Sequence, residues 1–174
     1  YQSARLLGLI EEAHHQQVRC RCHDLVGNAS LTVTRIHGGH ADNVVPDSCE
    51  LLLDRRMVPG EDEEAVKAEL QQLLDHAHTH AGVEAEIIAW QPTTGGATQT
   101  DSSETIVEQS LVACRRHGQN EPGPFGFQGG CDLVHFRSLG AKGVVIGPGS
   151  LAVAHKPDEF VPIDESTGFA RHKT

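Results

Sequence analysis

The histidines give this sequence its main capacity for chemistry, and there are twelve of them. Histidine is the commonest metal ligand and the usual proton carrier near neutral pH. His155 has the most informative setting, because it follows a Gly-Pro-Gly break at 147–149 and precedes Asp158 and Glu159. Loops at the carboxyl ends of strands in open α/β sheets bind ligands. His155 can therefore be a metal ligand, a general base or a structural residue, and either carboxylate could orient its imidazole.

A second candidate segment runs from Gly38 to Arg56 and places Asn43 and a di-arginine at the two ends of a loop-plus-strand unit. Arginine holds carboxylates through a fixed, bidentate fork of donors. Because side chains alternate along a strand, Arg55 and Arg56 must point to opposite faces, so that only one can face a site. Considered without other information, this segment is better explained as a solvated strand end.

Two further groups of possible ligands have simpler explanations. His76 and His80 stand four residues apart and could chelate a metal, but the HExxH pattern is absent, which favours a solvated helix end. Cys20 and Cys22 lack the CxxC spacing and a second pair, which argues against a zinc knuckle. The glycine-rich stretch 122–130 lacks the lysine and hydroxyl of a phosphate-binding Walker loop.

Composition limits the classes of function. The 174 residues suffice for one domain or two small lobes. Asp and Glu (24) outnumber Lys and Arg (14), which gives a net charge of −10 and argues against binding nucleic acid or anionic lipid. No apolar run reaches the ~18–20 residues of a membrane span. Five cysteines, an odd number without framework spacing, indicate reduced thiols and a cytoplasmic protein.

The first half of the chain must supply the elements that position the Asn43 loop. Hydrophobic periodicity predicts, in order, a helix over 4–16, strands over 30–37 and 49–56, a helix that carries the acidic run 61–64 at its N-terminus and ends at Gly82, and a third strand over 83–90. This α-β-β-α-β order lacks only a leading strand to complete a split βαβ sandwich.

The second half begins after a polar linker at 91–100, the best domain boundary in the chain. Asp101 and Glu104 predict a capping box at the start of a helix. The expected elements are a helix over 103–117 that ends at Gly118, a strand and turn over 122–130, a helix over 131–139 that ends at Gly140, and a buried strand over 142–146. Such alternation is typical of an α/β lobe.

Two motifs together carry a family resemblance. The segment GGHADNVVPDSCELLLDRRMVPGED, followed at a distance by GCDL and GVVIGPGSLAVAHKPDEF, resembles the acetylornithine deacetylase and succinyl-diaminopimelate desuccinylase family. These zinc amidohydrolases and peptidases also include carboxypeptidase G and aminoacylase. The resemblance covers about residues 1–164. It implies an α+β dimerisation (lid) domain over 1–91 that lacks its first strand, and the C-terminal part of an α/β catalytic domain over 92–174.

The resemblance also implies roles for individual residues. His155 matches the last metal ligand of a two-zinc centre. Asn43 and Arg56 match lid residues that contact substrate, with the arginine pairing with its carboxylate. Gly130 and Cys131 fall in a loop that touches bound substrate, where threonine is common at the second position. The cysteine departs from that pattern, although a backbone contact would survive the change.

Most of the family's catalytic groups have no counterpart here. Its HxD motif, bridging aspartate and Glu-Glu pair, which includes the general base, are expected upstream of Tyr1, as is the lid histidine that stabilises the oxyanion. The resemblance therefore implies that no catalytic residue lies within this chain and that the chain starts inside a longer gene product. We expect the 174 residues alone to bind zinc weakly, to show no turnover, and to expose strand edges and apolar faces.

The implied function is that of one part of a metal-dependent hydrolase. Such an enzyme cleaves the amide bond of an N-acyl amino acid or a dipeptide with a zinc-activated water, and N-acetylornithine is the best match. The implied cofactor is a pair of zinc ions, with cobalt as an alternative metal, and the implied assembly is a homodimer through the lid. The alternative is a non-catalytic dimerisation or binding module derived from the same family.

Overall fold

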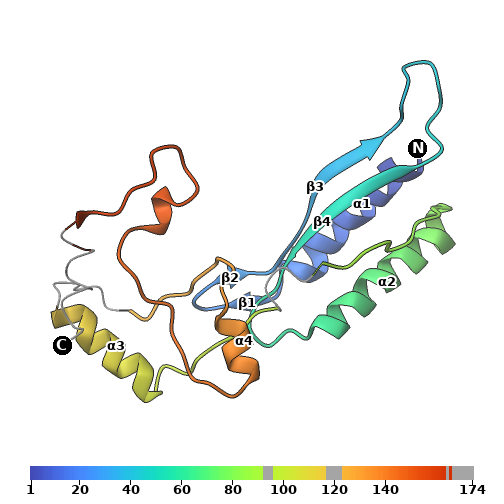
Figure 1. The fold of residues 1–174 in the computed structure, drawn as a ribbon. Helices are drawn as coiled ribbons and strands as arrows, with labels where there is room; N and C mark the ends of the chain where they lie inside the picture. Colours follow the sequence, from blue (N-terminus) through green and yellow to red (C-terminus); the bar gives the residue numbers. More distant parts are fainter. Residues whose placement is uncertain (92–95, 117–122, 164, 166–174) are drawn as a thin grey trace. The chain divides into compact units, whose positions relative to one another are not determined.

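The computed structural model describes residues 1–91, 96–116, 123–163 and 165 (Figure 1). The chain divides into two units. The first comprises Tyr1–Gln99 with Gly126–Val134, and the second comprises Thr100–Phe125 with His135–Thr174. The predicted domain boundary after residue 91 adjoins the undescribed residues 92–95 and stays a prediction.

The first unit is an α+β arrangement of two helices and a long β-hairpin. Its elements are α1 (Gln2–Ala13), a π-helical turn η1 (His14–Val18), the short strands β1 (Cys22–His23) and β2 (Gly27–Asn28), the long strands β3 (Ser30–Gly38) and β4 (Cys49–Arg56), and α2 (Glu63–Ala81). Helices α1 and α2 lie side by side along the hairpin (Figure 1). The α+β class predicted for this part of the chain is confirmed.

The β3–β4 hairpin is antiparallel and runs in register from Ser30 opposite Arg56 to Gly38 opposite Cys49, with a bulge between Val33 and Arg35. Alternate side chains of both strands pack toward the helices. The buried core that results consists of Leu6, Ile10, Val18, Ala29, Leu31, Val58, Ala77 and Val83. Within the described residues, β4 pairs with β3 along one edge and has no strand along its other edge.

The residues at the two ends of α2 explain where this helix begins and ends. The Asp62 carboxylate accepts a hydrogen bond from the N–H of Ala65 at 2.9 Å, as an N-cap residue does. At the other end Gly82 adopts the left-handed conformation with φ 61°, and its N–H donates to the carbonyl of His78 at 3.2 Å. The predicted stop at Gly82 is confirmed.

The left-handed cap at Gly82 predicts opposite effects for two glycine-to-alanine substitutions, at Gly82 and at Gly8. At both positions an added Cβ would meet no atom within 4 Å. We expect Gly82→Ala to destabilise the chain by about 1–2 kcal/mol, because an L-residue is strained at φ 61°. Gly8→Ala, inside α1, should instead stabilise it by about 0.5–1 kcal/mol. Urea unfolding of both variants measures the difference. Equal stability of the two variants would contradict the assignment of strain to Gly82.

The predicted third strand over 83–90 is wrong. The structure gives residues 83–91 no regular secondary structure. A strand needs a neighbouring edge for its N–H and C=O groups, and residues 83–91 pair with neither β3 nor β4. Trp90 holds the segment to α2 instead, because its indole N–H donates to Glu63 at 2.9 Å and its ring lies 5.2 Å from the Lys67 ammonium.

The described part of the second unit is helical or irregular. Helix α3 (Thr105–Arg116) lies within it, α4 (Leu133–Ser138) spans the passage from the first unit to the second, and η2 (Leu151–Val153) is a 3₁₀ turn. Both predicted helices are confirmed with shorter bounds, and Gly140 follows α4 with φ 84°. The predicted end at Gly118 lies outside the described residues.

The strands predicted over 122–130 and 142–146 are wrong, because residues 123–130 and 142–146 form no ladder in the structure. Their apolar residues satisfy the pattern of a strand, but these segments pair with no strand in the described part of the chain. Residue 122 lies outside the described part.

The predicted capping box at Asp101 and Glu104 is also wrong. The Asp101 carboxylate accepts hydrogen bonds from the N–H and the hydroxyl of Ser103, at 2.8 and 2.6 Å. Those bonds lower the pKa of Asp101, the hydroxyl bond having the larger effect. Glu104 precedes the helix and pairs with Lys142. The Asp101 side chain therefore stabilises a local turn and does not cap the helix.

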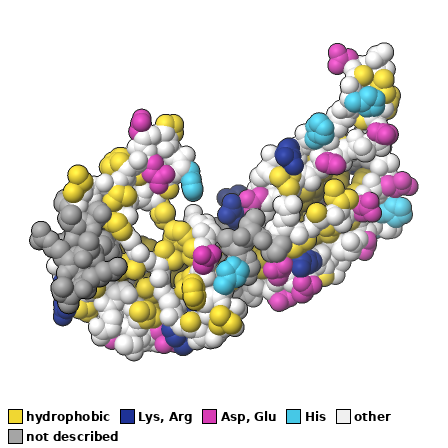
Figure 2. Space-filling model, in the orientation of Figure 1, with side chains coloured by type: hydrophobic (Ala, Val, Ile, Leu, Met, Phe, Trp, Pro, Cys, Tyr) yellow, Lys and Arg dark blue, Asp and Glu magenta, His cyan; other side chains and the backbone are white. Residues whose placement is uncertain are grey.

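Large apolar side chains reach the surface in both units (Figure 2). Ile88 is 73% exposed in the first unit, and Leu139 and Ile163 are 85% and 81% exposed in the second. The predicted exposure of apolar faces is confirmed. In the part of the chain that the structure describes, no helix combines the length and the apolar character needed to cross a membrane.

Candidate functional site

The hairpin separates the two lid residues that the sequence singled out. Asn43 lies in the exposed loop 39–48, next to the Gly38 end of β3, whereas Arg56 pairs with Ser30 at the opposite end. The seven residue steps from Cys49 to Arg56 span roughly 24 Å at the usual rise of a strand. Asn43 and Arg56 of one chain are therefore not brought together.

Of the two arginines, only Arg56 offers its guanidinium to a ligand. The Arg55 side chain is 5% exposed and pairs with Glu61. The Arg56 side chain is 64% exposed, and its Nη2 lies 2.9 Å from a carboxylate oxygen of Asp54, two residues earlier on β4. The predicted opposition of the two side chains is confirmed, and it supports the choice of Arg56 over Arg55.

A charged network, which the sequence did not reveal, fixes this end of the hairpin. The Glu61 carboxylate accepts hydrogen bonds from Arg55, from Arg21 at 2.9 Å and from the N–H of Val58 at 2.7 Å. Arg21 also binds Glu69 through two bonds of 2.7 and 2.8 Å. Glu61 belongs to the acidic run 61–64, which hydrophobic periodicity assigns only to a helix N-terminus, so no sequence signal marked it as a central residue.

The electrostatics of this network show which partners matter. Burial alone would raise the pKa of Glu61, but the hydrogen bonds from Arg55, Val58 and Arg21 outweigh it, so the pKa lies below its ordinary value of 4.5. The pKa of Arg21 is raised, chiefly by its bonds to Glu69 and then by its bond to Glu61. The lowered pKa of Glu61 keeps its carboxylate ionised at neutral pH.

Gly130 and Cys131 belong to the first unit, together with the rest of 126–134. The side-chain amide of Gln128 donates to the carbonyl of Val26 at 2.9 Å. A Cβ on Gly126 would overlap the carbonyl group of Leu25, so this close approach requires glycine. Gly130 is exposed and Cys131 is half-buried, and the structure puts both in the same unit as Arg56.

His155 lies in an exposed loop with unusual backbone geometry. Its φ is 58° and that of Asp158 is 62°, both in the left-handed region that non-glycine residues rarely occupy. The Glu159 carboxylate accepts a hydrogen bond from the backbone N–H of His155 at 3.0 Å. The sequence suggested that a carboxylate would orient the imidazole, but the structure shows Glu159 holding the backbone. Strained backbone of this kind is frequent at functional sites.

The described residues do not fit a complete zinc centre. Catalytic zinc needs about three protein ligands and structural zinc about four, yet no group of three or more His, Cys, Asp or Glu side chains converges in the part that the structure describes. His155 could supply one ligand. All five cysteines are free, as their number and spacing predicted.

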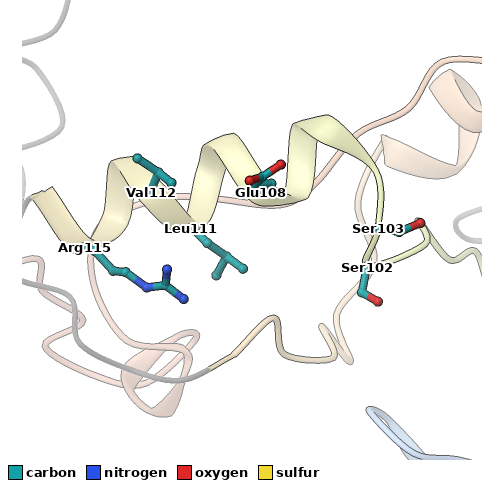
Figure 3. Close-up of a pocket in the computed structure, with 6 residues that line it drawn as sticks. All are labelled: Ser102, Ser103, Glu108, Leu111, Val112 and Arg115. Carbon is teal, nitrogen blue, oxygen red and sulfur yellow. The ribbon is translucent and has the colours of Figure 1, made fainter.

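The second unit carries a shallow hollow of about 330 Å³ along α3 (Figure 3). It is lined by Ser102, Ser103, Glu108, Leu111, Val112 and Arg115. None of the predicted site residues lines it. Because Ser103 is already bonded to Asp101 and the lining is mixed in character, the hollow does not identify a substrate.

Comparison with known proteins identifies the kind of domain. Residues 1–81 match the family model of the peptidase dimerisation domain, M20_dimer. An acetylornithine deacetylase from Myxococcus xanthus is 30% identical over 137 residues, which is 78% of this chain and 34% of that protein. A provisionally named carboxypeptidase from Aspergillus clavatus is 30% identical over 142 residues, 82% of this chain and 31% of that protein.

A provisionally named succinyl-diaminopimelate desuccinylase from Mycobacterium tuberculosis is 28% identical over 152 residues, 86% of this chain and 39% of that protein. The first unit thus has the fold of a peptidase dimerisation domain. Residues 1–81 therefore belong to the dimerisation domain of the M20 peptidase family, and the similarity of the longer chain to the named deacetylase and desuccinylase supports the same family, whose members are hydrolases and are generally metal-dependent. The chain spans about a third of the length of these relatives.

Proposed function

We propose that this sequence is part of a metal-dependent hydrolase that cleaves the amide bond of an N-acyl amino acid, with N-acetylornithine as the preferred substrate. The observation that carries the proposal is the pairing of two motifs: the hairpin that ends in Arg56 and the His155 loop. Relatives that match 78%, 82% and 86% of the chain are named as a deacetylase, a carboxypeptidase and a desuccinylase.

In this proposal Arg56 anchors the carboxylate of the substrate. Its only ion-pair partner among the described residues is Asp54, at 2.9 Å on an exposed part of β4. An exposed pair of this kind contributes about 0–1 kcal/mol, so a substrate carboxylate can replace Asp54 at small cost. The bidentate fork of arginine would then fix the orientation of the substrate.

His155 would contribute one ligand to a zinc pair, whose ions would polarise the scissile carbonyl and activate water when bound. The left-handed backbone at His155 and the bond from its N–H to Glu159 would hold the loop in place. Gly130 and Cys131 would contact the substrate mainly through their backbone. The remaining ligands and the general base would come from residues other than those described.

The separation of Asn43 from Arg56 supports a homodimer. A substrate two residues long extends over roughly 7 Å, which is far less than the roughly 24 Å between the two ends of the hairpin. One chain therefore cannot apply both residues to one substrate. In a dimer formed through the first unit, Asn43 of one copy could serve the substrate that Arg56 of the other copy holds.

The test is an amidase screen of the complete protein that contains this sequence, with Zn²⁺ or Co²⁺ added. We expect hydrolysis of N-acetylornithine to exceed that of N-succinyl amino acids and dipeptides, and we expect the 174-residue chain alone to show none. If the complete protein hydrolyses no N-acyl amino acid with either metal, the alternative holds, namely a non-catalytic dimerisation or binding module. The alternative is tested because no three metal-binding side chains converge in the part of the chain that the structure describes.

A further inference from the structure

Two histidines at the C-terminal end of α2 form a pair that the proposed function does not use. His76 and His80 are both exposed, and their ring centroids lie 4.2 Å apart with an angle of 24° between the planes. Residues four apart on a helix lie above one another on the same face. The two exposed rings are therefore neighbours on one face of α2, and a small rotation of one side chain would let both direct a ring nitrogen at one ion.

A hydrogen bond fixes the tautomer of one ring in the form that binds a metal. Nδ1 of His80 lies 3.1 Å from the carbonyl oxygen of His76. A carbonyl oxygen only accepts, so in the neutral ring Nδ1 carries the hydrogen and Nε2 carries the free lone pair. Metal-ligating histidines commonly donate their second ring nitrogen to a backbone carbonyl in this way, which orients the ring and raises its basicity as a ligand.

The electrostatic setting favours a cation. The last turn of a helix carries partial negative charge from its carbonyl groups, and Asp75 lies next to His76 in the sequence of this acidic chain. Asp75 accepts a hydrogen bond from Gln71, one turn earlier. Arg5 donates to the carbonyl of Ala81 at 3.0 Å, five residues beyond the carbonyl of His76 that bonds His80, so its positive charge does not occupy the backbone oxygen of the histidine pair.

We propose that His76 and His80 form a binding site for one borderline divalent cation of the Cu²⁺, Ni²⁺ and Zn²⁺ class. Imidazole nitrogen suits these ions, and a site of this kind follows the order Ni²⁺ < Cu²⁺ > Zn²⁺. Two protein ligands leave the remaining positions to water, because no third donor converges on the pair in the described part of the chain. The ion is therefore exchangeable and serves as a clamp across one turn of α2.

The test uses Ni²⁺ as the probe, because this ion does not oxidise the five free thiols. We expect calorimetric titration of the chain to show one Ni²⁺ bound per chain, and EDTA to remove it. His76→Ala and His80→Ala should each weaken this binding at least tenfold. His78→Ala is the matched control, because it lies on the same exposed helix end but two residues from either partner, on a different side of the helix.

A spectroscopic measurement locates the ion independently of affinity. In wild type and in His78→Ala, paramagnetic Ni²⁺ should broaden the ring proton signals of His76 and His80 before those of the other histidines. The proposal is wrong if either alanine variant at these two positions binds Ni²⁺ like wild type, or if His78→Ala loses the site. It is also wrong if other histidines broaden first. Loss of hydrolase activity plays no part in these outcomes, so they are independent of the proposed function.

Discussion

His155→Asn should lower the metal-dependent hydrolysis of N-acetylornithine by more than about 100-fold in the complete protein that contains this sequence. Loss of a residue that only supports a metal ligand costs about 10–100-fold, so loss of a direct ligand should exceed that range. Asparagine is the informative replacement, because it tolerates the left-handed backbone that His155 adopts with φ 58°. Kinetics measured alongside the zinc content of the purified protein should show both falling together.

Two controls separate the imidazole from the shape of the loop. Lys156→Ala changes the next exposed side chain and should leave both activity and zinc content near those of wild type. Glu159→Gln keeps an acceptor for the backbone N–H of His155 and should cost much less than His155→Asn. If His155→Asn retained its zinc and its activity, His155 would not be a ligand, whatever the family resemblance suggests.

Glu61→Ala should destabilise the chain by about 3–5 kcal/mol. The Arg55 side chain, 5% exposed, would lose its partner, and breaking a buried pair from one side leaves an uncompensated charge. The N–H of Val58 would lose its acceptor as well. Urea unfolding measures the loss. Glu64→Ala is the matched control, since Glu64 pairs with Lys67 while 79% exposed, and its removal should cost no more than about 0.5–1 kcal/mol.

The pH dependence of stability gives this prediction a second readout. The folded state lowers the pKa of Glu61 below 4.5, so its contribution is complete above that pH and disappears as the pH falls through the folded value. Wild type should lose stability between about pH 5 and that lower value, and Glu61→Gln should lose less over the same interval. Parallel curves for the two proteins would show that Glu61 is not linked to folding.

The long elements of the first unit could be predicted because local signals agreed. Strand β4 has the predicted bounds, and α2 has an aspartate cap, an amphipathic stripe and a left-handed glycine within 21 residues. The segments 83–90 and 142–146 carry equally apolar patterns but form no strands. Strand formation depends on a partner edge, which a local pattern cannot contain, whereas helix hydrogen bonds stay within one segment.

The candidate site was predictable to a similar degree. Alternation along β4 implied that only one of two arginines could be available, and the structure leaves Arg56 exposed. The network around Glu61 joins residues 21, 55, 58, 61 and 69. No spacing rule connects such distant positions, so only the folded chain reveals them. The roles of Asn43, Gly130, Cys131 and His155 stay predictions.

One edge of β4 pairs with no strand in the part of the chain that the structure describes, and this edge bears on how the chain behaves at high concentration. Unpaired N–H and C=O groups along a strand can template cross-β growth by other chains. The strand contains Leu51, Leu52 and Leu53 in a row, flanked by Glu50 and Asp54. Such flanking charges act as gatekeepers, because stacking identical copies would bring like charges together. We therefore expect the acidic residues of β4 to oppose fibril formation in a strand whose leucines would otherwise favour it.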